Sequence, residues 1–326
     1  MPGGGVRTQI LRTKEQLEKE GVEVLLFDQW RRYDWSHIDL IHVFSTDMRN
    51  YFLLRALPSN KPLVVSPIID KMYPWTLLRG FYLLAGALPS QILTSYNAHR
   101  LAVQKAKAFL VRAKYERAIL EKGFGVAPCR VFDVPNGVDA KFIWASPERF
   151  RKTYGMQGFV LYVGQIGNPR KNLKRLIRVA ADLHHVPFVL VGPILQTQEA
   201  REVLSLVHRY ENIHLLGRLP EEDLLSAYAA CHVFVLPSLI EGTGLVALEA
   251  GLAGANVVVT RCGGPPDYLG NLAEYVEPKS VRSIRRGIER ALQKPKGEKL
   301  RKHLAHHYLW EHVIQRLLRV YEHVLS

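Results

Sequence analysis

Short apolar runs alternate along the chain with longer segments in which polar and apolar residues are mixed. The runs are rich in β-branched and aromatic residues and are bounded by polar or glycine-containing breaks, as is typical of buried parallel strands. This repeated alternation predicts parallel α/β sheets. The expected strands are Leu40–Phe44, Leu63–Val65, Gln91–Thr94 and Phe109–Arg112 in the first half, and Phe159–Gly164, Pro187–Pro193 and runs beginning at Asn212, His232 and Ala255 in the second.

The beginning of the chain has a glycine-rich segment before its first periodic stretch. Val6, Ile10, Leu11 and Leu17 recur at helical spacing, so an amphipathic helix is expected after the glycines. The apolar run Glu23–Phe27 is expected to form a strand directly after that helix.

The stretch from His232 to Gly254 combines a strand, a glycine-bearing turn and the start of a helix near Leu245. A helix N-terminus presents backbone N–H groups and a positive dipole end, which suits a phosphate group. Glu249 lies about one turn into that helix, roughly 6–8 Å from the turn at 1.5 Å rise per residue, where a carboxylate can accept hydrogen bonds from a ribose diol. Glu241 precedes the turn and is expected to point toward a sugar beyond the phosphate.

Length and composition indicate a globular protein with room for two domains, at 326 residues and 48% hydrophobic content. The weakly charged apolar stretch Gly80–Pro89 is too short to span a bilayer. Cys129, Cys231 and Cys262 lack metal-ligand spacing and are expected to be reduced thiols, which favours the cytoplasm. The net charge of +14 favours an anionic partner, either a nucleotide or an acidic membrane surface, although a basic solvated surface explains it equally well. No nucleic-acid-binding motif is present.

The segment PSLIEGTGLVALEAGLAGANVVV, with Glu241 and Glu249 separated by seven residues, resembles the paired-glutamate motif of retaining glycosyltransferases of the GT-B fold, family 4. Thr243 departs from that pattern, because an aromatic residue is common there. The resemblance implies two Rossmann-like, doubly wound α/β domains facing across a cleft. We expect an acceptor-binding domain over residues 1–150, a donor-binding domain over 151–305 and a last helix over 306–326 that crosses back to the first domain.

Members of this family have a strand before the glycine loop, and almost nothing precedes Gly3 in this sequence. We therefore expect that the first strand of the N-terminal domain is missing from the chain as given: either the true start lies upstream, which is the favoured interpretation, or the domain folds with a gap. This expectation leaves open whether the chain as given is active.

The resemblance also implies roles for individual residues. Glu241 would hold the donor sugar, and Arg170 and Lys171 would grip the diphosphate; a basic first turn on a solvated helix is the alternative for the last two. Glu249 would hold the ribose, and the backbone at Arg218 and Leu219 would receive the base. The remaining donor-binding candidates are Gly4, Gly5, Gly164, Gly242, Thr243, Gly244 and Leu245.

On the acceptor side, the loop after Val65 carries no histidine, and Asp70 is the nearest titratable candidate, with loop capping as its alternative role. His42 lies in an expected strand and is interpreted as a structural histidine rather than a base. The segment Lys71–Leu88 combines apolar, aromatic and basic residues. It is interpreted either as a helix at a membrane interface or as a buried helix covering the sheet.

The function expected from this resemblance is the transfer of a hexosyl group, with retention, from a nucleoside diphosphate sugar to a saccharide or lipid-linked acceptor. UDP-sugars are favoured and GDP-mannose is possible. No cofactor or metal is expected, because basic residues serve the diphosphate and the sequence has no Asp-x-Asp motif or His/Cys cluster. The expected location is the cytoplasm, with possible peripheral contact at the inner face of an anionic membrane. A nucleotide-sugar epimerase, a phosphorylase or a non-catalytic nucleotide-sugar binder on the same fold are the alternatives.

Overall fold

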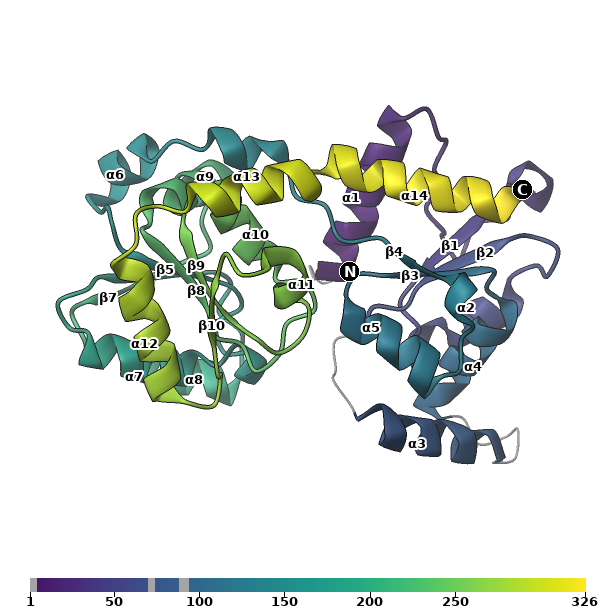
Figure 1. The fold of residues 1–326 in the computed structure, drawn as a ribbon, viewed down its shortest axis with the longest axis horizontal. Helices are drawn as coiled ribbons and strands as arrows, with labels where there is room; N and C mark the ends of the chain where they lie inside the picture. The colour runs from purple at the N-terminus through teal and green to yellow at the C-terminus, as the bar shows by residue number, and fades with distance from the viewer. Residues whose placement is uncertain (1–4, 70–73, 88–93) are drawn as a thin grey trace. The chain divides into compact units, whose positions relative to one another are not determined.

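The computed structural model describes residues 5–69, 74–87 and 94–326 and divides them between two compact units (Figure 1). Unit 1 combines the chain up to Gly137 with Trp310–Ser326, and unit 2 is formed by Val138–Leu309. In the part of the chain that the structure describes, no helix is both long and apolar enough to cross a lipid bilayer.

Unit 1 contains a parallel sheet whose described strands follow the order β1-β2-β3-β4. Each strand is short and apolar, and β2 and β3 are buried along their whole length, as expected of central parallel strands covered on both faces. The strands are β1 (Ile41–Phe44), β2 (Leu63–Ser66), β3 (Ala108–Val111) and β4 (Val131–Asp133).

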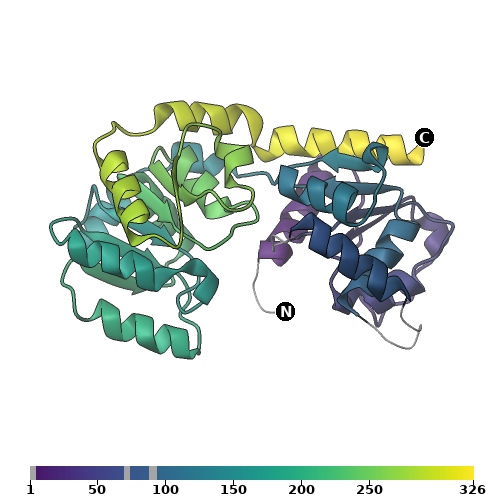
Figure 2. The same cartoon turned by 60° about the horizontal axis from the view of Figure 1, so that its bottom comes forward.

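Helices cover both faces of this sheet (Figures 1 and 2). On one face, Leu17 of α1 and Leu317 of α14 pack with Val64 and Leu110. On the other face, α2, α3 and α4 contribute side chains to a core around Phe109. The helices are α1 (Gly5–Lys19), α2 (Tyr51–Ala56), α3 (Trp75–Ala87), α4 (Ser95–Lys105), α5 (Lys114–Ala118) and α14 (Trp310–Leu325), and a π-helical turn spans Ile119–Gly123.

Two expectations for unit 1 are wrong. Glu23–Phe27 is not a strand: it has no sheet neighbour among the described residues, and Leu25, Leu26 and Phe27 are exposed. The Asn-Gly pair at positions 136 and 137 predicts a tight turn, but the structure has no turn at these residues. The glycine instead allows a close approach, because a Cβ atom at Gly137 would lie 2.4 Å from the ring of Trp310.

The remaining expectations for this half are met in part. The helix after the glycines is α1, and three of the expected strands are β1, β2 and β3. The expected strand Gln91–Thr94 lies outside the described residues except for Thr94, which caps the N-terminus of α4. Strand β4 was not predicted from the sequence.

Unit 2 contains a larger parallel sheet with the order β10-β9-β8-β5-β6-β7. The order reverses direction next to β5, because β5 pairs with β6 on one side and with β8 on the other. Ligands of open α/β sheets bind at such a switch point, outside the carboxyl ends of the strands. The strands are β5 (Val160–Val163), β6 (Phe188–Val191), β7 (Ile213–Gly217), β8 (Val233–Leu236), β9 (Asn256–Thr260) and β10 (Glu274–Val276).

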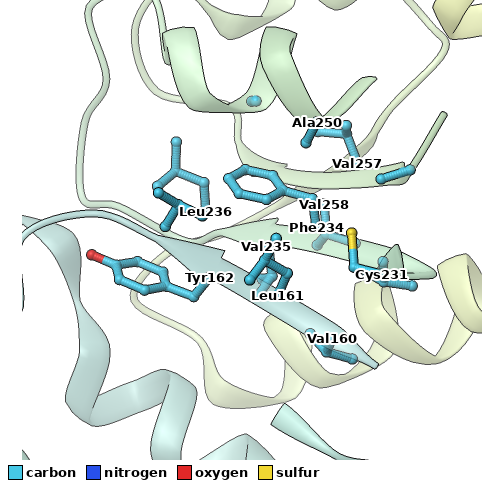
Figure 3. Close-up of a cluster of buried hydrophobic side chains, with 14 of the residues drawn as sticks. Val160, Leu161, Tyr162, Cys231, Phe234, Val235, Leu236, Ala250, Val257 and Val258 are labelled. Carbon is cyan, nitrogen blue, oxygen red and sulfur yellow. The ribbon is translucent and has the colours of Figure 1, made fainter. Parts of the chain in front are cut away.

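The core of unit 2 is built from the two central strands and the helices beside them. Tyr162 of β5, Phe234 of β8 and Val258 of β9 are fully buried members of this core, to which Ala250 of α10 also belongs (Figure 3). Helices α7, α8 and α12 lie on one face of the sheet and α9, α10 and α13 on the other (Figure 1). The helices are α6 (Glu148–Tyr154), α7 (Leu173–Asp182), α8 (Gln198–Val207), α9 (Glu221–Ala230), α10 (Leu245–Leu252), α11 (Pro265–Leu269), α12 (Val281–Leu292) and α13 (Glu298–His307).

The unit boundaries differ from those expected. The first crossing lies at Gly137 rather than near residue 150, and the segment after it contains α6, whose Phe150 packs into the core of unit 2. The last helix, α14, begins at Trp310 rather than at residue 306, and it belongs to unit 1.

Candidate functional site

The carboxyl end of β5 leads into a short 3-10 helix, Pro169–Lys171, that carries both expected phosphate-binding cations. Asn172 follows it in the left-handed region, with φ of 62°. Its buried amide donates to the carbonyl of Pro237, after β8, at 2.8 Å and to that of Pro278, after β10, at 2.7 Å. One side chain therefore fixes Arg170 and Lys171 beside the carboxyl ends of neighbouring strands.

Lys171 pairs with Glu241. The ammonium lies 2.6 Å from Oε1 of Glu241, and the two side chains are only 12% and 7% exposed. A second contact joins the same segments, because the N–H of Leu239 donates to the carbonyl of Arg170 at 2.8 Å. The structure thus brings together two of the three residues expected to act on the donor.

The backbone around Glu241 is held by the loop that follows β9. Glu241 donates its N–H to the carbonyl of Cys262, and its own carbonyl accepts from Gly264. Gly263 has a φ of 103°, and a Cβ atom there would lie 1.8 Å from the carbonyl oxygen of Glu241. This approach requires glycine at position 263, and it fixes where the carboxylate emerges.

The turn after Glu241 opens α10. Gly244 is its N-cap, with φ of 74°, and the helix begins at Leu245 as expected. Gly242 and Thr243 are buried beside it. The amides of the first turn of a helix have no intrahelical acceptors, so this end of α10 can receive an anion.

Glu249, one turn further along α10, is half-buried and accepts a hydrogen bond at 2.8 Å from the hydroxyl of Tyr228 on α9. Burial, and next the neighbouring Glu249 carboxylate, raise the pKa of Tyr228 well above its usual range. The tyrosine therefore stays protonated and donates. Its bond holds Oε2 of Glu249.

Gly164 directly follows β5, at a point where two chain segments meet closely. A Cβ atom at Gly192, which follows β6, would lie 1.9 Å from the carbonyl oxygen of Gly164. Tyr162 lies below, and its hydroxyl donates to the carbonyl of Gln165 at 3.2 Å. Burial is the main cause of the raised pKa of Tyr162, and the Glu241 carboxylate adds to it. Tyr162 thus borders the site from the core side.

The other donor candidates of unit 2 lie where their strands end. Arg170 is half-buried, and its positive charge acts on Tyr162. Arg218 is exposed and Leu219 half-buried, directly after β7. Among the described residues, neither Arg218 nor Leu219 has a hydrogen bond or ion pair with Lys171 or Glu241. The contacts of Arg218 and Leu219 with a nucleobase therefore stay predictions.

The candidates of unit 1 are placed separately. Gly5 opens α1, while Gly4 and Asp70 lie outside the described residues. His42 is held at both ring nitrogens, by the hydroxyl of Tyr321 at 2.7 Å and that of Ser66 at 2.9 Å. Burial lowers the pKa of His42 to about 3. These contacts give His42 the structural role that was expected.

Asn172 and Tyr228 were not singled out in the sequence. Asn172 occupies a left-handed position directly after the basic pair, and an asparagine between a 3-10 helix and an α-helix is a usable signal for such a junction. Tyr228 lies in an otherwise apolar stretch and is identified only by the packing of α9 against α10.

Taken together, unit 2 presents a cation, two carboxylates and a helix N-terminus at one edge of its sheet. The cation and helix end suit a diphosphate, and the carboxylates suit hydroxyl groups on either side of it. Among residues 5–69, 74–87 and 94–326, no group of three or more His, Cys, Asp or Glu side chains could hold a metal ion.

The sequence of this unit matches a known family. The sequence model described as glycosyl transferases group 1 matches residues 147–307. An O-antigen chain mannosyltransferase B of Escherichia coli is 29% identical over 205 residues, which are 59% of this chain and 53% of the relative. An MMP alpha-(1->4)-mannosyltransferase of Mycolicibacterium hassiacum is 25% identical over 214 residues, 62% of this chain and 51% of the relative. The chain spans about half the length of these curated relatives.

Solved structures share the whole fold. Sucrose-phosphate synthase from Thermosynechococcus elongatus superposes with a TM-score of 0.74 at 18% identity, covering 99% of this chain and 94% of that one. Anabaena HepE, solved in complex with UDP and glucose, superposes with a TM-score of 0.72 at 16% identity, covering 98% and 96%. Unit 2 thus matches the family of glycosyl transferases group 1 over residues 147–307, and the two parallel-sheet α/β units share the GT-B fold of these solved structures.

Proposed function

We propose that the protein is a retaining hexosyltransferase of family 4 that transfers a sugar from a nucleoside diphosphate donor to a saccharide or lipid-linked acceptor hydroxyl. The observation that carries this proposal is the 2.6 Å pair of Lys171 and Glu241 beside the turn that opens α10. It puts a cation for the diphosphate next to a carboxylate for the sugar. The mannosyltransferase names of the curated relatives favour a mannosyl donor, so GDP-mannose is to be tested beside the UDP-sugars.

In the proposed reaction, the acceptor oxygen bonds to the anomeric carbon while the bond from that carbon to the diphosphate oxygen breaks. Charge grows on the leaving oxygen, so preorganised donors there contribute most to catalysis. Lys171, Arg170 and the amides of Thr243–Leu245 are the proposed donors. The leaving phosphate takes the acceptor's proton on the same face, so no side-chain base is required.

Glu241 and Glu249 divide the binding of the donor. Glu241 would accept hydrogen bonds from sugar hydroxyls, and Glu249 from the ribose diol. Because Tyr228 occupies Oε2 of Glu249, the ribose would bind mainly through the other oxygen. We place the reaction in the cytoplasm at the inner face of an anionic membrane, where a lipid-linked acceptor of envelope polysaccharide synthesis would be met.

The proposal is tested by release of nucleoside diphosphate from GDP-mannose and from UDP-sugars in the presence of polyprenyl-linked saccharides. Product mass and the anomeric configuration by NMR then define the transfer. We expect acceptor-dependent turnover from one donor, with retention and in the presence of EDTA. Free sugar released without any acceptor would support an epimerase, and nucleotide binding without turnover would support a non-catalytic binder; either result contradicts the proposal.

A further inference from the structure

Helix α3 exposes an unusual amount of apolar surface. Leu77, Phe81 and Leu84 recur at helical spacing, so they share one side, and they are 60%, 56% and 66% exposed. Trp75 and Leu83 on the same helix are also exposed. Five of the fourteen large exposed apolar side chains among the described residues therefore lie on this one helix of 13 residues. Such clustering marks an interaction surface, whereas single exposed residues do not.

The opposite side of α3 explains why the helix stays in place. Leu78 and Ala85 are buried, and Tyr82 packs against the ring of Phe124 with centroids 5.0 Å apart. The helix thus packs on the π-helical turn Ile119–Gly123 and on α4, and it presents an apolar side outward, as the membrane-interface interpretation of the sequence expected. It lies on the outside of unit 1 in both views (Figures 1 and 2).

Cations surround this helix. The guanidinium of Arg79 on α3 donates to the carbonyl of Lys122 at 3.3 Å. The ammonium of Lys122 lies 5.7 Å from the ring centre of Trp75, and the guanidinium of Arg100 lies 5.6 Å from that of Tyr82. The sequence of α3 contains no acidic residue. An apolar side flanked by basic groups is complementary to a membrane surface with anionic headgroups.

We infer that the exposed side of α3, formed by Trp75, Leu77, Phe81, Leu83 and Leu84 with Arg79, Lys122 and Arg100 around it, docks unit 1 on an anionic lipid surface. At 1.5 Å per residue, α3 is about 20 Å long, less than the roughly 30 Å of a hydrocarbon core, so it lies in the interface rather than across it. This inference deepens the proposed function, on which it rests for its lipid-linked acceptor, by naming the surface that reaches the membrane.

The test is co-sedimentation of the full chain with vesicles of phosphatidylcholine alone and of phosphatidylcholine mixed with phosphatidylglycerol. We expect binding only to the mixed vesicles, weakening as salt rises. The double variant F81Q/L84Q should bind about tenfold more weakly. Phe52→Gln is the matched control, because Phe52 is 63% exposed on α2 of the same unit, and it should bind within about twofold of the native chain.

Two charge-reversal variants test the electrostatic contribution to vesicle binding. Arg79→Glu should lose binding to the mixed vesicles, whereas Lys152→Glu, at an exposed position on α6 of unit 2, should not. Far-UV circular dichroism and nucleotide binding by unit 2 report whether each variant is folded. Equal vesicle binding by native chain and F81Q/L84Q overturns the inference, as does no binding to either vesicle. A self-association that F81Q/L84Q abolishes, without vesicle binding, assigns the surface to a second copy and also overturns it. In each case, retained turnover leaves the proposed function standing.

Discussion

The ammonium of Lys171 and the carboxylate of Glu241 meet at 2.6 Å, although 70 positions separate them in the chain. Both side chains are nearly buried, so each is the main neutralising partner of the other. Removing the cation would leave a carboxylate almost buried without compensation, and it would remove a proposed phosphate donor.

We expect Lys171→Met to lower the free energy of unfolding by about 3 kcal/mol, the usual cost of breaking a buried ion pair from one side. Turnover should fall about a hundredfold, because a donor to the leaving oxygen is lost. Chemical denaturation and steady-state kinetics measure the two effects. The control is Lys174→Met: Lys174 forms partly exposed ion pairs with Glu199 and Glu202, so stability should change by less than about 1 kcal/mol. Equal effects of the two substitutions would contradict the role given to Lys171.

Tyr228→Phe tests whether Glu249 is held for the ribose. The variant keeps the buried ring but loses the hydrogen bond to Oε2. We expect binding of the nucleoside diphosphate to weaken about tenfold, as for a bond to a charged group. The affinity for the 2′,3′-dideoxy nucleotide should differ less between the native chain and Tyr228→Phe, because this nucleotide has no diol for Glu249 to hold.

Isothermal titration calorimetry with both nucleotides gives this comparison. Tyr154→Phe is the matched control, since the Tyr154 hydroxyl donates to Asp223 on the other side of α9, at 3.2 Å. An identical loss with the diol and the dideoxy nucleotide would mean that Tyr228 only supports the fold.

Gly263→Ala should displace Glu241. The new methyl group would collide with the backbone carbonyl of Glu241, which flexible side-chain movement cannot relieve. Gly158→Ala is a matched control, because Gly158 also has a positive φ, 72°, but has nothing within 4 Å of a Cβ atom. We expect the control to lose about 1 kcal/mol from backbone strain alone, and Gly263→Ala to lose roughly 2 kcal/mol more together with most turnover. Similar melting temperatures for both variants would argue against the close approach.

His42 makes the stability of unit 1 depend on pH. Burial lowers its pKa from about 6.5 to about 3, so the folded chain keeps the ring neutral where the unfolded chain binds a proton. The stabilisation is therefore complete above pH 6.5 and is lost progressively as the pH falls toward 3, with a slope of about 1.4 kcal/mol per pH unit. Between pH 7 and pH 5 the stabilisation from His42 should fall by about 2 kcal/mol, so in urea unfolding the native chain should lose about that much more stability over this range than His42→Gln. An unchanged slope in the variant would show that His42 is not buried as a neutral ring.

The sequence was sufficient for what depends on local pattern. Apolar runs such as Val233–Leu236 are buried strands, and the glycines before Leu245 do open a helix. The sequence was misleading where an element forms only if another strand pairs with it. Glu23–Phe27 has strand composition, but it has no neighbouring strand among the described residues, and its backbone is irregular. Asn136–Gly137 has the composition of a turn, but the glycine is required by the ring of Trp310, which lies far away in the sequence.

The candidate site shows the same division. Glu241, Glu249 and the cations were named from motif and spacing. Their partners were not, since Tyr228, Asn172 and the Lys171–Glu241 pair depend on which helices and loops pack together. Contacts between segments tens of residues apart follow from the sheet order, and a single sequence does not specify that order.

The most direct test of the account is calorimetric titration of the full chain with UDP, GDP and ADP, in parallel with Glu249→Ala and with Glu211→Ala, a control at an exposed position of the same unit. We expect that one of the three nucleotides binds, that Glu249→Ala weakens this binding about tenfold, or about 1.4 kcal/mol, and that Glu211→Ala leaves it unchanged. No binding by the native chain, or equal binding by the native chain and Glu249→Ala, would contradict the claim that unit 2 holds a nucleotide through its paired glutamates.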